Sequence, residues 1–101
     1  MKHFKDNQRG GFIYCQNLGL QTIATKYLGP TDTKGARIKA VASGGETKTV
    51  DWNYAEDTNH NHASAALELA GQLRLDLQGV HHLIGGSTPT GNVYVLVGDI
   101  L

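Results

Sequence analysis

The chain has 101 residues, enough for one domain with a modest hydrophobic core but too few for two domains. Nine basic and nine acidic residues give a formal net charge of zero, which argues against a dedicated duplex DNA binder and against an acidic DNA mimic. The 13 glycines favour many turns between short strands over a helical bundle. A chain with no net charge is weakly soluble unless its surfaces are paired, so we expect a homo-oligomer such as a dimer.

Cysteine usage and hydropathy indicate a cytoplasmic protein. Cys15 is the only cysteine, so one chain forms no internal disulfide, as is typical of a reducing compartment. No apolar run reaches the roughly 18 residues of a membrane span. The apolar segment Phe12 to Cys15 is also too short for a signal peptide.

Residues 1–21 differ in composition from the residues that follow. The first part is polar and ends in two glycines, and a brief apolar patch follows it. We therefore expect residues 1–21 to be an N-terminal extension, flexible over at least Met1 to Gly10, with a short strand at Gly11 to Gln16. The alternatives are pairing of this extension onto a sheet edge and an origin from an upstream start codon. Residues 22–101 are expected to form one α+β domain.

Three strands are predicted first, at Thr22 to Leu28, Ala36 to Ala42 and Glu46 to Trp52. The first strand has no purely apolar side, which favours an edge position or use of both faces. The second strand places Arg37 and Lys39 on one face and smaller apolar residues on the other. Two glycines favour a tight hairpin between the second and third strands.

One helix and two further strands complete the expected fold. The helix should run from His62 to about Arg74, with a cap at Asn59 or Asn61. Its expected apolar stripe consists of Ala63, Ala66, Leu67, Ala70 and Leu73. The last strands are expected at Val80 to Ile84 and Asn92 to Val97, joined by a flexible polar loop from Gly85 to Gly91. The order is βββαββ, a single antiparallel sheet of four or five strands with one helix on one face.

The first hairpin concentrates positive charge. Five of the nine basic residues lie between positions 26 and 48: Lys26, Lys34, Arg37, Lys39 and Lys48. Arginine offers a fork for phosphate, and a lysine beside a glycine-rich loop adds charge near exposed backbone N–H groups. The aromatic residues that could stack a base are Tyr27, Trp52, Tyr54 and Tyr94. The alternative is an ordinary solvated face, because the loop does not have the pattern of a P-loop.

No catalytic group, metal site or cofactor is predicted. Four histidines, His60, His62, His81 and His82, could bind a metal together with Glu56 or Asp57. Exposed loop and strand histidines are the simpler interpretation, since neighbouring strand residues point to opposite faces. Cys15 lies in the extension, and no serine sits in a nucleophile-elbow pattern.

The stretch from Thr25 to Ala40, TKYLGPTDTKGARIKA, resembles small proteins encoded by bacteriophages, prophages and plasmids. A capped alanine-rich helix and a glycine-rich final hairpin extend the resemblance over about residues 22–97. In those proteins the stretch stands close to the N-terminus, so the 21-residue extension departs from the pattern. The resemblance implies a phage accessory gene, and such genes often counter host defence by binding a defence protein or sequestering a nucleotide signal.

The sequence therefore predicts a non-catalytic phage accessory protein that acts in the host cytoplasm by binding. Its partner would be a small anionic nucleotide or a host defence protein such as a CRISPR effector. The expected binding residues are Lys26, Tyr27, Lys34, Arg37, Lys39, Trp52 and Tyr94. The alternatives are a single-stranded nucleic-acid-binding accessory protein and a structural virion component.

Overall fold

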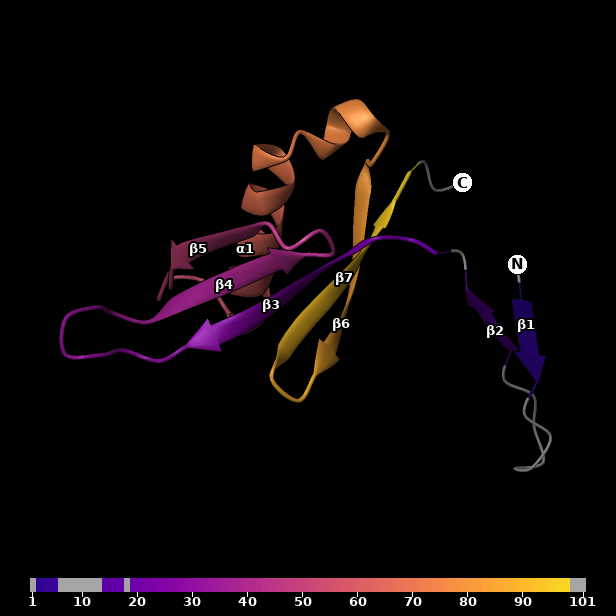
Figure 1. The fold of residues 1–101 in the computed structure, drawn as a ribbon. Coiled ribbons are helices and arrows are strands. Elements are labelled where there is room, and N and C mark those ends of the chain that lie inside the picture. The colour runs from indigo at the N-terminus through magenta and orange to yellow at the C-terminus, as the bar shows by residue number, and fades with distance from the viewer. Residues whose placement is uncertain (1, 6–13, 18, 99–101) are drawn as a thin grey trace.

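Five antiparallel strands form one sheet, and a single α-helix crosses one of its faces (Figure 1). This computed structural model describes residues 2–5, 14–17 and 19–98. Its main elements are β3 (Thr22–Leu28), β4 (Arg37–Ala42), β5 (Thr47–Asp51), α1 (Thr58–Gln72), the 3-10 helix η1 (Leu75–Gln78), β6 (His82–Thr88) and β7 (Gly91–Val97). The spatial order of the strands is β5-β4-β3-β7-β6. The predicted α+β fold with order βββαββ is confirmed.

A separate hairpin precedes this sheet. β1 (Lys2–Lys5) and β2 (Tyr14–Asn17) pair with each other in an antiparallel two-stranded sheet. The flexibility expected for this extension stays a prediction, and positions 1 and 6–10 lie outside the described residues. The expected strand at Gly11 to Gln16 is present over its last three positions and continues to Asn17, while its first three positions also lie outside the described residues.

β3 is the central strand of the five-stranded sheet. It pairs with β4 along one side and with β7 along the other. Of the two alternatives for β3, the edge position is wrong, because a paired strand lies on each side of it. Both faces are used, as the other alternative predicts: Ile23 is fully buried under α1, while Lys26 on the other face is exposed. Alternation within β4 is confirmed, since Ile38 is buried and Lys39 is exposed.

The helix begins one turn earlier than predicted. Asp57 is its N-cap, and the Asp57 carboxylate accepts a hydrogen bond of 2.7 Å from the backbone N–H of His60. Asn61 therefore lies inside the first turns instead of capping them. The buried stripe is also rotated from the expected one, because Leu67 is 61% exposed while Leu69 is fully buried. The residues of α1 that are buried are Asn61, His62, Ala65, Ala66 and Leu69.

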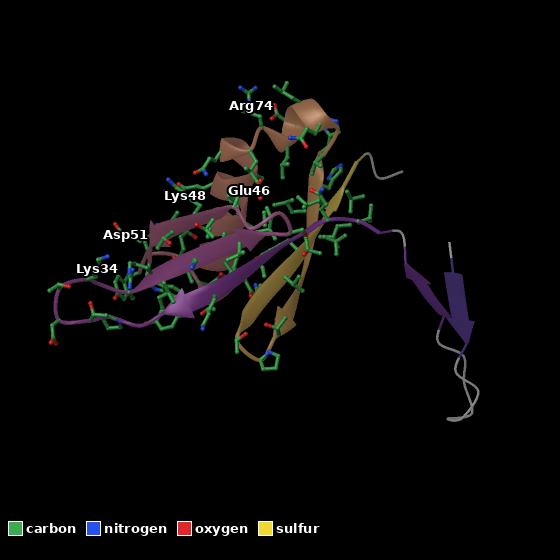
Figure 2. All side chains as sticks on the ribbon, in the orientation of Figure 1. Lys34, Glu46, Lys48, Asp51 and Arg74 are labelled. Carbon is green, nitrogen blue, oxygen red and sulfur yellow. The ribbon has the colours of Figure 1, made fainter. Side chains whose placement is uncertain are left out.

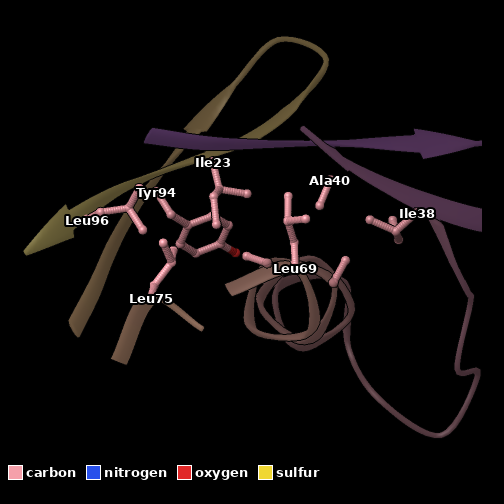
Figure 3. Packing of buried hydrophobic residues seen from close by; sticks show 9 residues of the cluster. Ile23, Ile38, Ala40, Leu69, Leu75, Tyr94 and Leu96 are labelled. Atoms are coloured by element: carbon pink, nitrogen blue, oxygen red, sulfur yellow. The ribbon is translucent and has the colours of Figure 1, made fainter. Parts of the chain in front are cut away.

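The core lies between α1 and the sheet (Figure 3). Alanines at the contact, Ala40 on the sheet and Ala65 and Ala66 on the helix, are fully buried and allow the two layers to approach closely. Leu69 projects from α1 toward Ile23 and Tyr94 on the sheet. Burial of such side chains provides the main stabilisation of a small two-layer domain.

The second hairpin is longer and more regular than predicted. Most of the segment from Gly85 to Gly91 belongs to β6, and a turn at Pro89 and Thr90 joins it to β7. The expected flexible loop was therefore wrong. Gly85 is accommodated because the ring of Tyr94, its cross-strand partner, packs over it and covers the bare backbone.

Candidate ligand-binding face

The face of the sheet opposite α1 is not covered by any helix or strand within residues 19–98 (Figure 1). The alternation of β3 and β4 places Lys26, Arg37 and Lys39 on this open face, together with short apolar side chains such as Ala24 and Val41. An antiparallel sheet with one bare face ordinarily presents polar residues to water there. Here the face combines cations with exposed apolar area.

A hollow of about 670 Å³ lies in the middle of the open face. Its lining residues come from β3, β4 and the β6–β7 hairpin: Ala24, Thr25, Lys26, Leu28, Lys39, Val41, Thr88, Thr90, Asn92 and Val93. Gly91 is the cross-strand neighbour of Lys26, and the backbone of β3 occupies the place where a side chain at position 91 would lie. The short side chain of Ala24 contributes to the depth of the floor.

Lys26 and Lys39 are direct cross-strand partners at the edge of this hollow. Both side chains are exposed, and neither forms an ion pair with any residue that the structure describes. The row across the sheet runs Thr49, Lys39, Lys26, Gly91 and Thr88, and it contains no acidic residue. Like charges placed directly opposite one another are destabilising. An anion between the two ammonium groups would relieve this repulsion.

Arg37 lies two residues before Lys39 on the same face of β4. Its register partners are Leu28 on β3 and Asp51 on β5. The Nε atom of Arg37 is buried and has no hydrogen-bond partner among the described residues. A buried donor without a partner costs free energy, and a bound acceptor would recover part of it.

Lys34 is on the β3–β4 loop, outside the hollow (Figure 2). The Thr31 hydroxyl accepts a hydrogen bond of 3.1 Å from the backbone N–H of Lys34, while the Lys34 carbonyl accepts one of 2.8 Å from the Thr31 N–H. These bonds fix the loop backbone and leave the Lys34 side chain exposed.

The aromatic residues of the predicted binding set do not lie on the open face with the lysines. Tyr27 and Trp52 lie on the α1 side of the sheet, where their rings contact edge to face with centroids 5.2 Å apart. Tyr94 is 8% exposed and belongs to the core, so its ring is not available to a partner. The predicted set of seven residues is thus divided between the open face, the β3–β4 loop, the α1 side and the core.

The histidines are also separated. His60 is exposed, and its Nδ1 lies 3.0 Å from the Asp57 carboxylate. The hydrogen bond from the His60 backbone N–H is the largest of the effects that lower the pKa of Asp57. His62 is buried under the sheet. Within the described ranges, no group of three or more histidine, cysteine or carboxylate side chains is arranged to hold a metal ion.

Sequence reasoning missed that Thr88, Thr90 and Val93 lie beside the lysines. Their proximity follows from the pairing of β3 with β7, which joins segments at opposite ends of the chain. The glycines and threonines of the second hairpin were a signal for bare amides and hydroxyls, but they did not indicate which strand the hairpin would contact.

Comparison of the chain with protein-family models, curated proteins and solved structures found no match. Within the part of the chain that the structure describes, no helix combines the length and apolar character needed to cross a membrane.

Proposed function

We propose that this protein is a non-catalytic binding protein that captures a small phosphate-bearing ligand of the nucleotide class in the hollow of its open sheet face. The observation that carries the proposal is the cross-strand pair Lys26 and Lys39, two cations held side by side without a carboxylate partner in residues 19–98. Without a bound ligand, the repulsion between these two ammonium groups is not compensated by a nearby negative charge among the described residues.

The chemistry around the lysine pair suits such a ligand. Two ammonium groups can donate to phosphate oxygens, and the hydroxyls of Thr88 and Thr90 provide further donors at the same rim. The floor formed by Ala24 and Val93 is apolar and can receive a sugar or a base. A hollow of about 670 Å³ is also of the size that small-molecule sites typically have.

A small ligand fits the open face better than an extended strand of nucleic acid. Single-strand binders usually combine a positive groove with aromatic rings on which bases stack. Here Tyr27 and Trp52 lie on the other side of the sheet, and Tyr94 is buried. The formal net charge of zero also provides little general attraction for a polyanion.

The biological setting we propose comes from the resemblance of Thr25 to Ala40 to small phage-encoded proteins. In that setting the protein counters host antiviral defence by sequestering a nucleotide signal in the host cytoplasm. A protein that binds without turnover removes a signal in proportion to its own concentration. Blocking a host defence protein through the same face is the second candidate, favoured by the apolar residues exposed beside the lysines, such as Val41.

The test is native mass spectrometry of the protein with a panel of cyclic oligonucleotides and ADP-ribose-type signals, followed by titration calorimetry of any adduct. Lys26→Gln combined with Lys39→Gln should weaken binding at least about tenfold, because two charge-assisted contacts are lost. The matched control combines Lys34→Gln with Lys48→Gln, which removes the same charge outside the hollow and should bind as the unmodified protein does.

An equal loss in both double variants would attribute binding to overall charge and contradict the proposed site. Failure of every panel member to bind a folded sample would refute the nucleotide proposal. A parallel titration with oligo(dT) distinguishes the nucleic-acid alternative. Affinity for an extended strand should rise with oligonucleotide length and fall steeply with salt, whereas a ligand held in one hollow shows a weaker salt dependence.

A further inference from the structure

β6 forms one edge of the five-stranded sheet and is open along its outer side. It pairs with β7 through all seven of its residues, and no other described strand lies beside it. Within residues 19–98, no hydrogen bond covers its outward backbone groups. A long strand edge with free N–H and C=O groups is a template for pairing with another strand.

The two edges of this sheet differ in how they are protected. β5, at the opposite edge, is shorter and carries Lys48 and Asp51, which discourage pairing. β6 has the sequence HLIGGST, with no lysine, arginine or carboxylate and no proline. It therefore has none of the usual features that keep an edge strand unpaired.

The surface next to β6 is apolar on the open face of the sheet. Ile84 is 51% exposed, and its cross-strand partner Val95 is partly exposed beside it. Gly86 follows on the same face, and a Cβ added there would meet open space. The large apolar side chain of Ile84 thus lies two positions before Gly86, which has no side chain, on the same face of the strand.

We propose that β6 pairs antiparallel with β6 of a second copy of this chain, which joins the two sheets into one of ten strands. A second copy fits because the edge is complementary to itself when the two-fold axis passes through Gly85. In that register Ile84 of each copy lies opposite Gly86 of the other, so the larger side chain covers the empty position. The uncharged strand brings no like charges together across the axis, and the chain has no net charge to oppose association.

This register has a consequence for the open face. Thr88, which lines the hollow, comes to lie opposite His82 of the partner subunit, so each hollow gains a neighbouring imidazole. The pairing itself rests on β6 alone and stands independently of the ligand proposed above.

The test is sedimentation velocity of the full chain over a wide concentration range. The unmodified protein should sediment as a dimer that dissociates on dilution. Gly86→Lys should weaken dimerisation at least about tenfold, because it fills the position that Ile84 needs and places two charges at the interface. The monomer tolerates this change, since open space surrounds the added side chain. Thr49→Lys on the exposed face of β5 adds the same charge at the other edge and should leave the dimer intact.

Hydrogen exchange provides a second measurement on the same samples. The outward amides of β6 should exchange more slowly as the protein concentration rises. A protein that stays monomeric at every concentration would refute the proposal, and so would a dimer that survives Gly86→Lys unchanged. Protection of β6 that does not depend on concentration would assign the edge to another part of the same chain and overturn the pairing of two copies.

Discussion

Thr25 on β3 and His62 on α1 are joined by a hydrogen bond of 2.7 Å between the threonine Oγ1 and the histidine Nδ1. Both side chains are nearly inaccessible, at 4% and 3% exposure, so the bond ties the helix to the central strand from inside the core. The ring of Trp52 lies edge-on to the imidazole, with centroids 6.5 Å apart. Burial lowers the pKa of His62, because the charged imidazolium is poorly solvated there.

The pKa of His62 leads to a prediction about stability and pH. The folded pKa lies below the unfolded value of about 6.5, so the unfolded chain binds more protons between these two values. The stability that follows from keeping His62 uncharged should therefore be fully present above about pH 6.5. The free energy of unfolding should decrease as the pH falls from there through that window. Urea unfolding from about pH 7.5 to about pH 5 measures the slope.

The matched variants for this prediction are His62→Gln and His60→Gln. His62→Gln should flatten the pH dependence, because the buried titrating group is gone while an amide can still bond to Thr25. His60→Gln makes the same substitution at an exposed position of α1 and keeps the buried imidazole, so it should retain the dependence that comes from His62. Equal slopes in the unmodified protein and His62→Gln would show that His62 does not cause the dependence.

Thr25→Val should destabilise the fold by about 1–3 kcal/mol, because it leaves the buried Nδ1 of His62 without a partner. Thr49→Val is the control; it makes the same change at an exposed position and should stay within about 0.5 kcal/mol. The double variant Thr25→Val/His62→Leu should lose less free energy of unfolding than the sum of the losses in the two single variants. The reason is that each single change breaks the same hydrogen bond, which the double variant loses only once. Thermal and urea unfolding of the four variants test this coupling.

Much of this fold was predictable because local patterns specify it. The alternation of Ile23, Thr25 and Tyr27 against Ala24, Lys26 and Leu28 set the two faces of β3 correctly. The helix register was not predictable from hydrophobicity, because two polar residues, Asn61 and His62, occupy buried positions. Their burial depends on tertiary hydrogen bonds that the helical pattern does not encode.

The candidate site was predictable only in part, for the same physical reason. The shared face of Arg37 and Lys39 follows from strand periodicity, and their proximity to Lys26 follows from a short hairpin. The position of Thr88 beside the lysines depends on which strand β7 pairs with, and that pairing is determined by packing across the whole sheet. The placement of Tyr94 in the core likewise reflects its contact with Gly85 on the neighbouring strand.

Asn61 fixes the segment that leads into α1. Its Oδ1 accepts a hydrogen bond of 2.7 Å from the Asn53 N–H, and its Nδ2 donates to the carbonyls of Asn53, Glu56 and Asp57. Asn61→Asp keeps the shape but replaces the donor with a charged acceptor facing three carbonyl oxygens. We expect a loss of about 1–3 kcal/mol or more in unfolding free energy. Asn59→Asp makes the same change on the exposed first turn, where a carboxylate is favoured, and should be close to neutral.

Arg74 is the non-glycine residue with a positive φ within the described part of the chain, at φ 52°. It stands between α1 and η1, and its contact with Asp76 is exposed, so its side chain adds little to stability. Arg74→Gly should raise the unfolding free energy by about 0.5–1 kcal/mol relative to Arg74→Ala, because glycine adopts this conformation without steric strain. Thermal unfolding of the pair tests the difference, and equal stability would mean that the backbone is unstrained there.

Gly91 is the position on β7 where the sheet tolerates no side chain. A Cβ added to Gly91 would collide with the backbone carbonyl of Thr25 on the neighbouring strand, and a backbone atom of a central strand cannot move aside as a side chain can. Gly91→Ala should therefore cost about 3 kcal/mol or more and should widen the hollow beside Lys26 if the strands separate. Gly86→Ala is the matched control when both variants are compared at a concentration where the protein is monomeric, because open space then surrounds Gly86; it should be neutral or stabilise by up to about 1 kcal/mol. Comparable unfolding midpoints for the two variants would show that β3 and β7 can separate at Gly91 at little cost. In that case the close approach of these two strands would not determine the shape of the hollow's floor.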